Sequence, residues 1–436
     1  MDALGYTGIL QAEGLGTSRN RELNSRVWPD QTNSLRETVV MAREYQPRRF
    51  LRHAPNRLLY QYFYSRKALE EVDFSALTET HVEPIYEAWL RLPDEARKDM
   101  EQDFQDIDEL ATEGGSKAIL DEADFHGEDL AEQFASLTGF YEHSFWTFLE
   151  RPKYWRGALA LHHADTVPGS YWRKRKNLPR KPASVDDASI HQLEQKVSGY
   201  FHSKQGRGRN CKVECYKRKD LDYFFAYPED YAQAIIEWEG KDFKRRPQHP
   251  AFEIIFVYSR KEGTLDIYLS GDRKPVPVLQ AIFADTILQS ELGPDQKDER
   301  VYDLSPVRAR QFQFAYGPES GIADVAVNKL RLKVFGKKER ILLEADPTHN
   351  KQAVFDLLDK VAKGIPLYQV AVTQVGIMVT FAHNPASRKP GTRAFEISWP
   401  NSCSLKHDGR DGIIRKMLAD SGIEPREPAK EDSAAS

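Results

Sequence analysis

The fold class of this chain can be read from residues 202–218, HSKQGRGRNCKVECYKR, because the hydrophobic pattern changes within them. Before this stretch, apolar residues recur every three or four positions, which is typical of amphipathic helices. From Cys211 onward they alternate with polar residues, which is typical of strands with one buried face. Gly206 and Gly208 mark the change, since glycine commonly ends a helix. We therefore expect a helical part followed by a part that contains sheets.

The helical pattern predicts an all-α domain over residues 48–163. Val82, Ile85 and Trp89, for example, fall on one face of a helix. The segments between successive helices are short, which favours antiparallel packing. Residues 164–204 are predicted to form a proline-containing linker and a connecting helix.

The second part, residues 205–423, shows one supersecondary pattern four times: strand, turn, strand and helix. In the first unit, the helix is expected to begin at Pro228 and to carry Tyr231, Ile235 and Trp238. Strands joined by tight turns are antiparallel, and a helix after each hairpin can cover one face of the sheet. The sequence therefore predicts an α+β protein with an N-terminal all-α helical domain. An antiparallel-sheet domain built from repeated β-hairpin–helix units follows it.

The composition is that of an ordinary globular protein. Of the 436 residues, 40% are hydrophobic and 29% are charged. The formal net charge of −4 does not indicate a strongly basic nucleic-acid-binding protein overall. Binding to nucleic acid would therefore require local clusters of basic residues. Residues 1–47, within which Met41 offers an alternative start, have the composition of a poorly ordered arm, and residues 424–436 have that of a disordered tail.

The cysteine count and the hydropathy pattern predict the compartment. Three cysteines are too few for a disulfide framework and favour a reducing environment. The first thirty residues contain no apolar region of the kind that a signal peptide needs. No apolar run approaches the roughly 20 residues that span a bilayer. We expect a cytoplasmic protein that does not interact with membranes.

Basic residues collect in two segments on either side of the connecting helix. Residues 172–181 carry six bases and no acid, and residues 204–219 carry seven bases and one acid. If the two segments converge, their charge is sufficient to bind phosphates with marked salt sensitivity. The cations predicted to contact nucleic acid, whether single-stranded or duplex, are Arg173, Lys174, Arg175, Lys176, Lys204, Arg207, Arg209, Lys212, Lys217, Arg218 and Lys219.

Two other segments have a distinctive charge pattern. Lys329, Arg331 and Lys333 alternate along a predicted strand and therefore share one of its faces. Residues 94–132 hold fifteen acids and three bases. We interpret most of these acids as the solvated faces of helices, with a surface for docking a protein partner as the sharper hypothesis.

Known catalytic and cofactor motifs do not match. A phosphate-binding loop lies between a strand and a helix and ends in Gly-Lys-Ser/Thr, whereas QGRGRN follows a helix and has no such ending. The cysteine and histidine spacings do not fit a zinc site, so we expect no metal and no cofactor. Carboxylates on predicted strands, Asp222, Glu253 and Glu396, are the candidates for a metal-dependent nuclease or another hydrolase. Such nucleases place a lysine two residues after the glutamate, where this chain has Ile255.

The sequence thus favours a non-enzymatic binding protein. Its basic segments would contact nucleic acid or another polyanion, and its helical domain would dock a protein partner. A hydrolase that uses the strand carboxylates and a purely structural interaction module are the alternatives. No motif identifies a family, and only in general texture does the chain resemble bacterial accessory proteins of mobile or defence loci.

Overall fold

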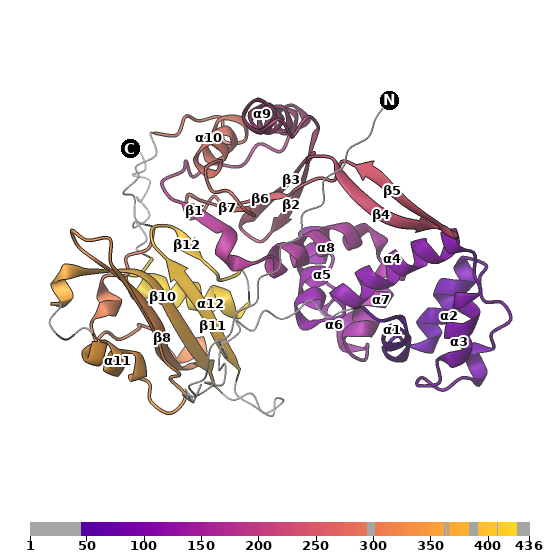
Figure 1. Ribbon diagram of the computed structural model, residues 1–436. Helices are drawn as coiled ribbons and strands as arrows, with labels where there is room; N and C mark the ends of the chain where they lie inside the picture. The colour runs from indigo at the N-terminus through magenta and orange to yellow at the C-terminus, as the bar shows by residue number, and fades with distance from the viewer. Residues whose placement is uncertain are drawn as a thin grey trace, which may run out of the picture. The chain divides into compact units, whose positions relative to one another are not determined.

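The computed structural model describes residues 45–293, 301–361, 363, 366–382, 391–407 and 409–424 (Figure 1). By their contacts, the described residues all belong to one unit. The predicted N-terminal arm lies outside the described residues except for its last three. The predicted C-terminal tail also lies outside them, except for Glu424.

The first part of the described chain is helical, and the second part contains strands and helices, as the sequence predicts in outline. The helices are α1 (Pro47–His53), α2 (Asn56–Ser65), α3 (Glu83–Leu90), α4 (Asp94–Leu110), α5 (Glu113–Phe125), α6 (Ala131–Ala135), α7 (Phe140–Glu150), α8 (Pro152–Thr166), α9 (Asp187–Gln205), α10 (Val276–Thr286), α11 (Ala353–Val361) and α12 (Arg410–Asp420). The strands are β1 (Trp172–Arg175), β2 (Cys211–Arg218), β3 (Leu221–Pro228), β4 (Gln233–Glu239), β5 (Asp242–Gln248), β6 (Ile254–Ser259), β7 (Thr264–Leu269), β8 (Ile322–Val334), β9 (Arg340–Glu344), β10 (Val370–Phe381), β11 (Thr392–Ser398) and β12 (Ser402–Cys403).

Helices α1–α8 form the N-terminal bundle, as the helical pattern predicts. Asp94 and Glu95 lie in the first turn of α4, where negative charge suits the helix dipole. The apolar face of α4, which includes Phe104, is buried in the bundle core. The chain then turns closely into α5: a Cβ atom on Gly115 would lie 2.2 Å from the carbonyl oxygen of Leu110, so only glycine fits there.

The connecting helix predicted before the first strand is α9. The Asp186 side chain accepts a hydrogen bond from the Ser189 backbone N–H and so caps its first turn. Gly206 has a φ of 70°, a left-handed conformation that favours glycine, and it ends the helix as expected.

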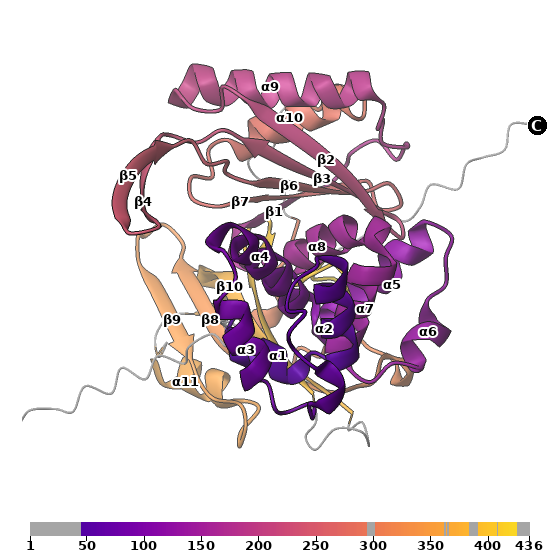
Figure 2. The same cartoon turned by 90° about the vertical axis from the view of Figure 1, so that its right-hand side faces the viewer.

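The first sheet has the strand order β1-β7-β6-β3-β2, and neighbouring strands are antiparallel. Helices α9 and α10 cover one face, where Phe201, Phe224 and Phe283 share a core. Helices α5 and α8 of the bundle cover the other face, where Ile119 packs in a core with Tyr223 (Figure 2). Because both faces are covered, every residue of β6 and β7 is buried, which explains why β6 is continuously apolar.

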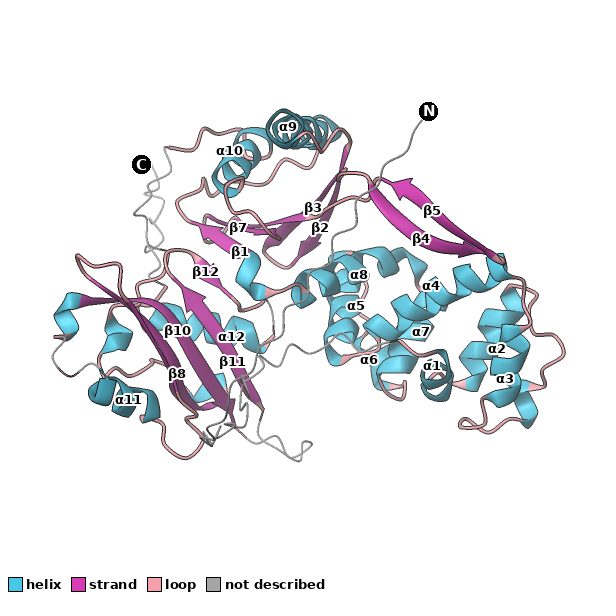
Figure 3. Ribbon diagram, viewed as in Figure 1, coloured by secondary structure: helices cyan, strands magenta, loops and turns pink. Residues whose placement is uncertain are grey.

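The second sheet has the strand order β12-β11-β10-β8-β9 and is also antiparallel. Leu330 and Leu332 of β8 share a core with Phe355 of α11 and Leu418 of α12, so these helices cover one face. Helices and antiparallel sheets of this kind confirm the predicted α+β fold class (Figure 3).

The predicted helix after Pro228 is wrong. Ile235 and Trp238 belong instead to β4, which pairs with β5 in a two-stranded antiparallel ribbon that is hydrogen-bonded to neither sheet. The β-branched Ile235 and Ile236 favour a strand over a helix. Gly240, with a φ of 63°, supplies the left-handed residue that a two-residue hairpin turn needs.

The structure of residues 172–175 also differs from the prediction, which placed them in a linker. These residues form β1 and pair with β7 at the edge of the first sheet. Their charged sequence, WRKR, gives no strand signal, because the acids that neutralise it come from distant parts of the chain.

Candidate functional site

The two basic segments predicted to bind nucleic acid lie at opposite edges of the first sheet. Segment 172–181 begins with β1, and segment 204–219 contains β2. Three strands separate these edges, so four strand spacings, about 19 Å, lie between them. The structure therefore does not bring the two segments together on one surface.

Burial removes two cations of segment 172–181 from contact with any ligand. Arg173 is 6% exposed and donates hydrogen bonds to the Ser170 carbonyl oxygen at 2.8 Å and to Ser402 Oγ at 2.7 Å. Lys174 is 4% exposed, and its Nζ lies 2.7 Å from a Glu424 carboxylate oxygen. Both residues were predicted to contact nucleic acid, and their burial corrects that prediction. Arg175 and Lys176 are half-buried.

Internal ion pairs occupy most cations of segment 204–219. Arg218 is 1% exposed and lies between Asp165, at 2.8 Å, and Asp121, at 3.1 Å. Its predicted contact with nucleic acid is therefore also corrected. The other paired cations are Arg207 with Asp230 at 2.9 Å, Lys212 with Glu194 at 3.0 Å and Lys219 with Asp121 at 3.9 Å. Lys204, Arg209 and Lys217 are exposed, and no carboxylate of the described residues lies within ion-pair distance of them.

A third group of cations lies on the second sheet. We name Lys329, Arg331 and Lys333 of β8 and Arg340 of β9 the basic row. The β8 residues of the row alternate with Leu330, Leu332 and Val334, which are buried in the core beneath α11 and α12. The basic row therefore occupies the sheet face opposite these helices, as the alternation in the sequence predicts.

The outer part of the basic row lacks neutralising partners. Lys333 and Arg340 are exposed and stand directly opposite each other on neighbouring strands. Arg331 is opposite the apolar Leu342 on one side and Gln374 on the other. Within the described part of the chain, no carboxylate pairs with these three cations. Like charges in direct cross-strand register destabilise a sheet, so this arrangement favours an external anion.

Lys329, at the inner end of the basic row, is paired differently. Its Nζ lies 2.6 Å from a Glu396 carboxylate oxygen on β11. Gly376 of β10 stands between these residues in register, and a Cβ atom there would lie 2.7 Å from Lys329 Cβ. Glycine thus leaves room for the lysine side chain to cross the strand.

The three candidate catalytic carboxylates do not meet. Asp222 is opposite Tyr258 on β6, whereas Glu253 immediately precedes Ile254 at the other end of that strand. Five residue steps, about 16 Å along the strand, separate the two positions. Glu396 belongs to the second sheet and binds Lys329 and Gln374. Nowhere in the described ranges do three or more histidine, cysteine, aspartate or glutamate side chains gather so as to hold a metal ion.

Glu253 has a partner that the sequence did not reveal. His163 Nε2 on α8 lies 2.8 Å from a Glu253 carboxylate oxygen, and this hydrogen bond raises the pKa of His163. The pair joins the helical bundle to the beginning of β6. The sequence has no local signal for it, because the two residues are 90 positions apart.

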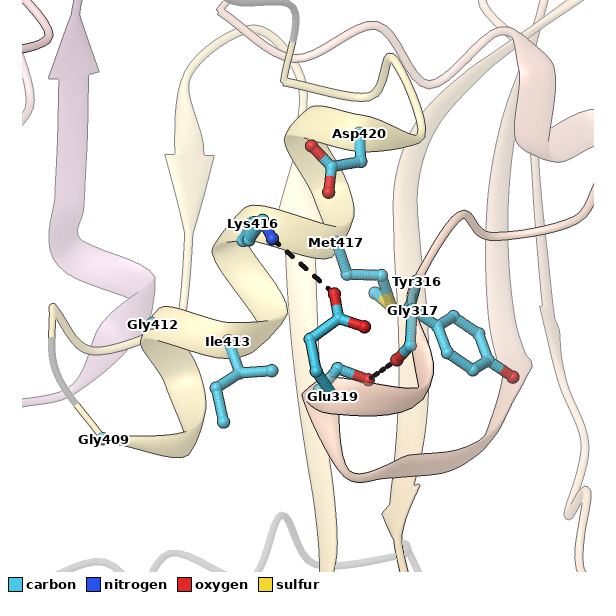
Figure 4. Close-up of a pocket in the computed structure, with 10 residues that line it drawn as sticks. Tyr316, Gly317, Glu319, Gly409, Gly412, Ile413, Lys416, Met417 and Asp420 are labelled. Carbon is cyan, nitrogen blue, oxygen red and sulfur yellow. Dashed lines mark hydrogen bonds and ion pairs between the residues drawn. The ribbon is translucent and has the colours of Figure 1, made fainter.

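A shallow hollow of about 350 Å³ lies between α12 and residues 316–320 (Figure 4). Its charged residues are Glu319, Lys416 and Asp420, and Lys416 Nζ lies 3.9 Å from a Glu319 carboxylate oxygen. The Glu319 and Lys416 side chains are more than 60% exposed. Ligand sites usually enclose a few buried, convergent polar groups, and this hollow does not offer them.

Comparisons with known proteins leave the family open. No known protein family matches the chain, and no curated protein is similar to it in sequence. The resemblance in texture to accessory proteins of defence loci therefore has no support from these comparisons. Within the described residues, no helix is both long enough and apolar enough to cross a membrane.

Proposed function

We propose that the protein is a nucleic-acid-binding protein whose main phosphate contact is the basic row. The observation that carries this proposal is the exposed and unneutralised cross-strand pair of Lys333 and Arg340, on the sheet face opposite α11 and α12. A polyanion supplies the negative charge that the described part of the chain does not. Lys337 and Lys338 in the turn between β8 and β9 are also exposed. Lys337 pairs with Glu339 at 3.6 Å, so among the described residues of this turn Lys338 is the one that adds unpaired positive charge there.

The spacing of the basic row suits a polymer of phosphates. Side chains on one face of a strand repeat every two residues, about 6.6–7 Å, so three cations follow β8 at regular intervals. Each phosphate that a cation neutralises releases counterions, which makes the affinity strongly dependent on salt. This proposal keeps the predicted function but moves its centre from segments 172–181 and 204–219 to the second sheet.

The helical bundle remains our candidate for docking a protein partner. Part of its negative charge serves the fold: Asp108 is buried and pairs with Arg49 at 2.9 Å, and Asp103 pairs with Arg66 at 2.7 Å. Glu95 and Glu132 are among the acids that stay exposed. These exposed acids are the ones available to a basic partner.

A salt titration tests the proposed function. We expect the wild-type protein to bind single-stranded or duplex DNA or RNA at low salt and to lose affinity steeply as salt rises. Replacing Arg331, Lys333 and Arg340 with alanine should reduce the slope of log K against log salt by about 2–3, since each phosphate contact contributes about 0.7–0.9. The measurement is fluorescence anisotropy with labelled oligonucleotides at several salt concentrations.

Two further variants make this result specific. Lys351→Ala, which removes an exposed lysine paired with Asp324 in the same part of the chain, is the matched control and should change little. Replacing Lys204, Arg209 and Lys217 with alanine tests the remaining exposed cations of segment 204–219. If this second triple variant alone lowers the slope, the contact belongs to that segment. If the wild type binds none of the probes at low salt, the proposed function is wrong.

A further inference from the structure

The ribbon β4–β5 has two chemically different faces. Cross-strand pairing places Ile236 opposite Arg245 and Trp238 opposite Phe243, while the alternate positions point to the other side. We define the apolar face of the ribbon as Ala234, Ile236, Trp238, Phe243, Arg245 and Pro247. The opposite, polar face carries Gln233, Ile235, Glu237, Glu239, Asp242, Lys244, Arg246 and Gln248.

The apolar face is uncovered. Trp238 is 66% exposed, Phe243 is 56% exposed and Ile236 is 54% exposed. The Trp238 and Phe243 rings contact each other edge to face, with centroids 5.2 Å apart, and no other ring of the described residues contacts them. Exposed apolar patches of this kind on the surface of a protein commonly mark an interaction site. An isolated two-stranded ribbon is only marginally stable, so a binding role explains its presence better than a contribution to stability.

Charge on the ribbon is divided between the faces. On the polar face, Lys244 and Arg246 form ion pairs with Glu239, and Arg246 also pairs with Glu237 at 3.2 Å. Both cations of this face are therefore neutralised within the ribbon. Arg245 is the one charged residue of the apolar face, and no carboxylate in the described ranges pairs with it. A matching partner thus has flat apolar groups and negative charge.

The base of the ribbon is anchored beside the loop that follows α9. The Tyr231 hydroxyl donates a hydrogen bond to the Gln205 carbonyl oxygen at 2.5 Å, and Arg207 pairs with Asp230 at 2.9 Å. Arg209, exposed and without an ion pair, is close in sequence to this anchor. The tip of the ribbon approaches α4 (Figure 3). The pKa of Glu239 at the tip is lowered mainly by its hydrogen bond from Lys244 and by the charge of Arg246, and the charge of Lys98 on α4 adds a smaller effect.

We propose that the apolar face of the ribbon is a stacking platform for the bases of a single-stranded nucleic acid, with Arg245 contacting its phosphates. This inference rests on the proposed function and specifies its ligand as single-stranded. Bases stack on exposed aromatic side chains regardless of sequence, and arginine adds charge and cation–π contacts. A duplex keeps its bases paired and stacked, so it cannot use this face.

A second copy of the chain fits the apolar face less well. In a two-fold symmetric contact the same face meets itself, which brings the Arg245 side chains of both copies into one apolar contact. The face has no carboxylate to neutralise them, and burying unpaired charge is costly. The negative charge of a nucleic acid removes this conflict.

The test compares single-stranded and duplex probes with a variant in which Trp238 and Phe243 are both replaced by alanine. We expect its affinity for oligothymidylate to fall about tenfold or more, while its affinity for a hairpin duplex and its salt slope stay unchanged. Ile235→Ala, which removes an apolar side chain from the polar face, is the matched control and should bind as the wild type does. A thermal melt of each variant checks that it is folded.

A crosslinking experiment on the wild type gives an independent readout. Oligonucleotides containing 5-iodouracil should crosslink on irradiation to the peptide that holds Trp238 or Phe243. If the wild type binds both probes, but the double variant keeps its affinity and crosslinks map elsewhere, the stacking platform is wrong while the proposed function stands. If no probe binds at low salt, both fall together. If the double variant instead abolishes self-association in sedimentation, the face joins two copies and the inference is overturned.

Discussion

Replacing Lys174 with methionine is expected to lower the free energy of unfolding by about 3–5 kcal/mol. Lys174 is 4% exposed and lies between two buried carboxylates, Glu424 at 2.7 Å and Asp266 at 3.7 Å. Burial works to raise the pKa of Glu424, but the charges of Lys174 and Arg415 lower it, so this carboxylate is ionised in the fold. Without the lysine it would be a buried charge that has lost its closest cation. Urea unfolding followed by circular dichroism measures the loss.

A second substitution separates the buried charge from simple packing. Replacing Glu424 with methionine in the Lys174→Met background should recover at least half of the lost stability, because the uncompensated carboxylate is then gone. Burial already raises the pKa of the remaining Asp266, which can take up a proton. Lys204→Met, at an exposed position without an ion pair, should change the free energy by no more than about 0.5 kcal/mol. A Lys174→Met protein within about 1 kcal/mol of the wild type would contradict this account.

Acidification from pH 7 to pH 4 is expected to cost about 3 kcal/mol of stability through His162 alone. This side chain is 7% exposed, and burial, followed by the nearby cations Lys406 and Arg218, lowers its pKa from 6.5 to about 4. The folded state therefore keeps it neutral, whereas the unfolded chain binds a proton below pH 6.5. The contribution is complete above pH 6.5 and is lost as the pH falls to about 4. Chemical denaturation at several pH values measures this loss.

The neighbouring histidine provides the control for this prediction. In the His162→Gln variant the difference in stability between pH 7 and pH 4 should shrink by about 3 kcal/mol. His163 has the opposite sign, since its hydrogen bond to Glu253 raises its pKa. It stabilises the fold below pH 6.5 and loses that effect as the pH rises through its folded pKa, so His163→Gln should steepen the acid loss. A His162→Gln protein with an unchanged pH profile would show that other groups cause the acid lability.

Local patterns in the sequence were sufficient for much of the fold. The change of period at Gly206 located the end of α9, because a left-handed glycine is a strictly local requirement. The alternation along β8 correctly placed Arg331 and Lys333 on one face, because a strand has a fixed period of two. The ribbon was missed although its signal was present: two runs that alternate around Gly240 fit a hairpin better than a helix.

Burial of charge was beyond the reach of local patterns. Lys174 and Arg218 belong to the two basic segments predicted to contact nucleic acid, yet each is buried among acids from distant positions, such as Glu424 and Asp165. The sequence determined most helices and strands, the antiparallel pairing of the predicted hairpins and the side of β8 that carries charge, since neighbouring residues suffice for these. It did not determine β1, which pairs with β7 only in the folded chain. The tertiary structure alone decided which cations remain free to meet a ligand. The physical reason is that neutralisation depends on which remote carboxylates the fold brings within about 4 Å.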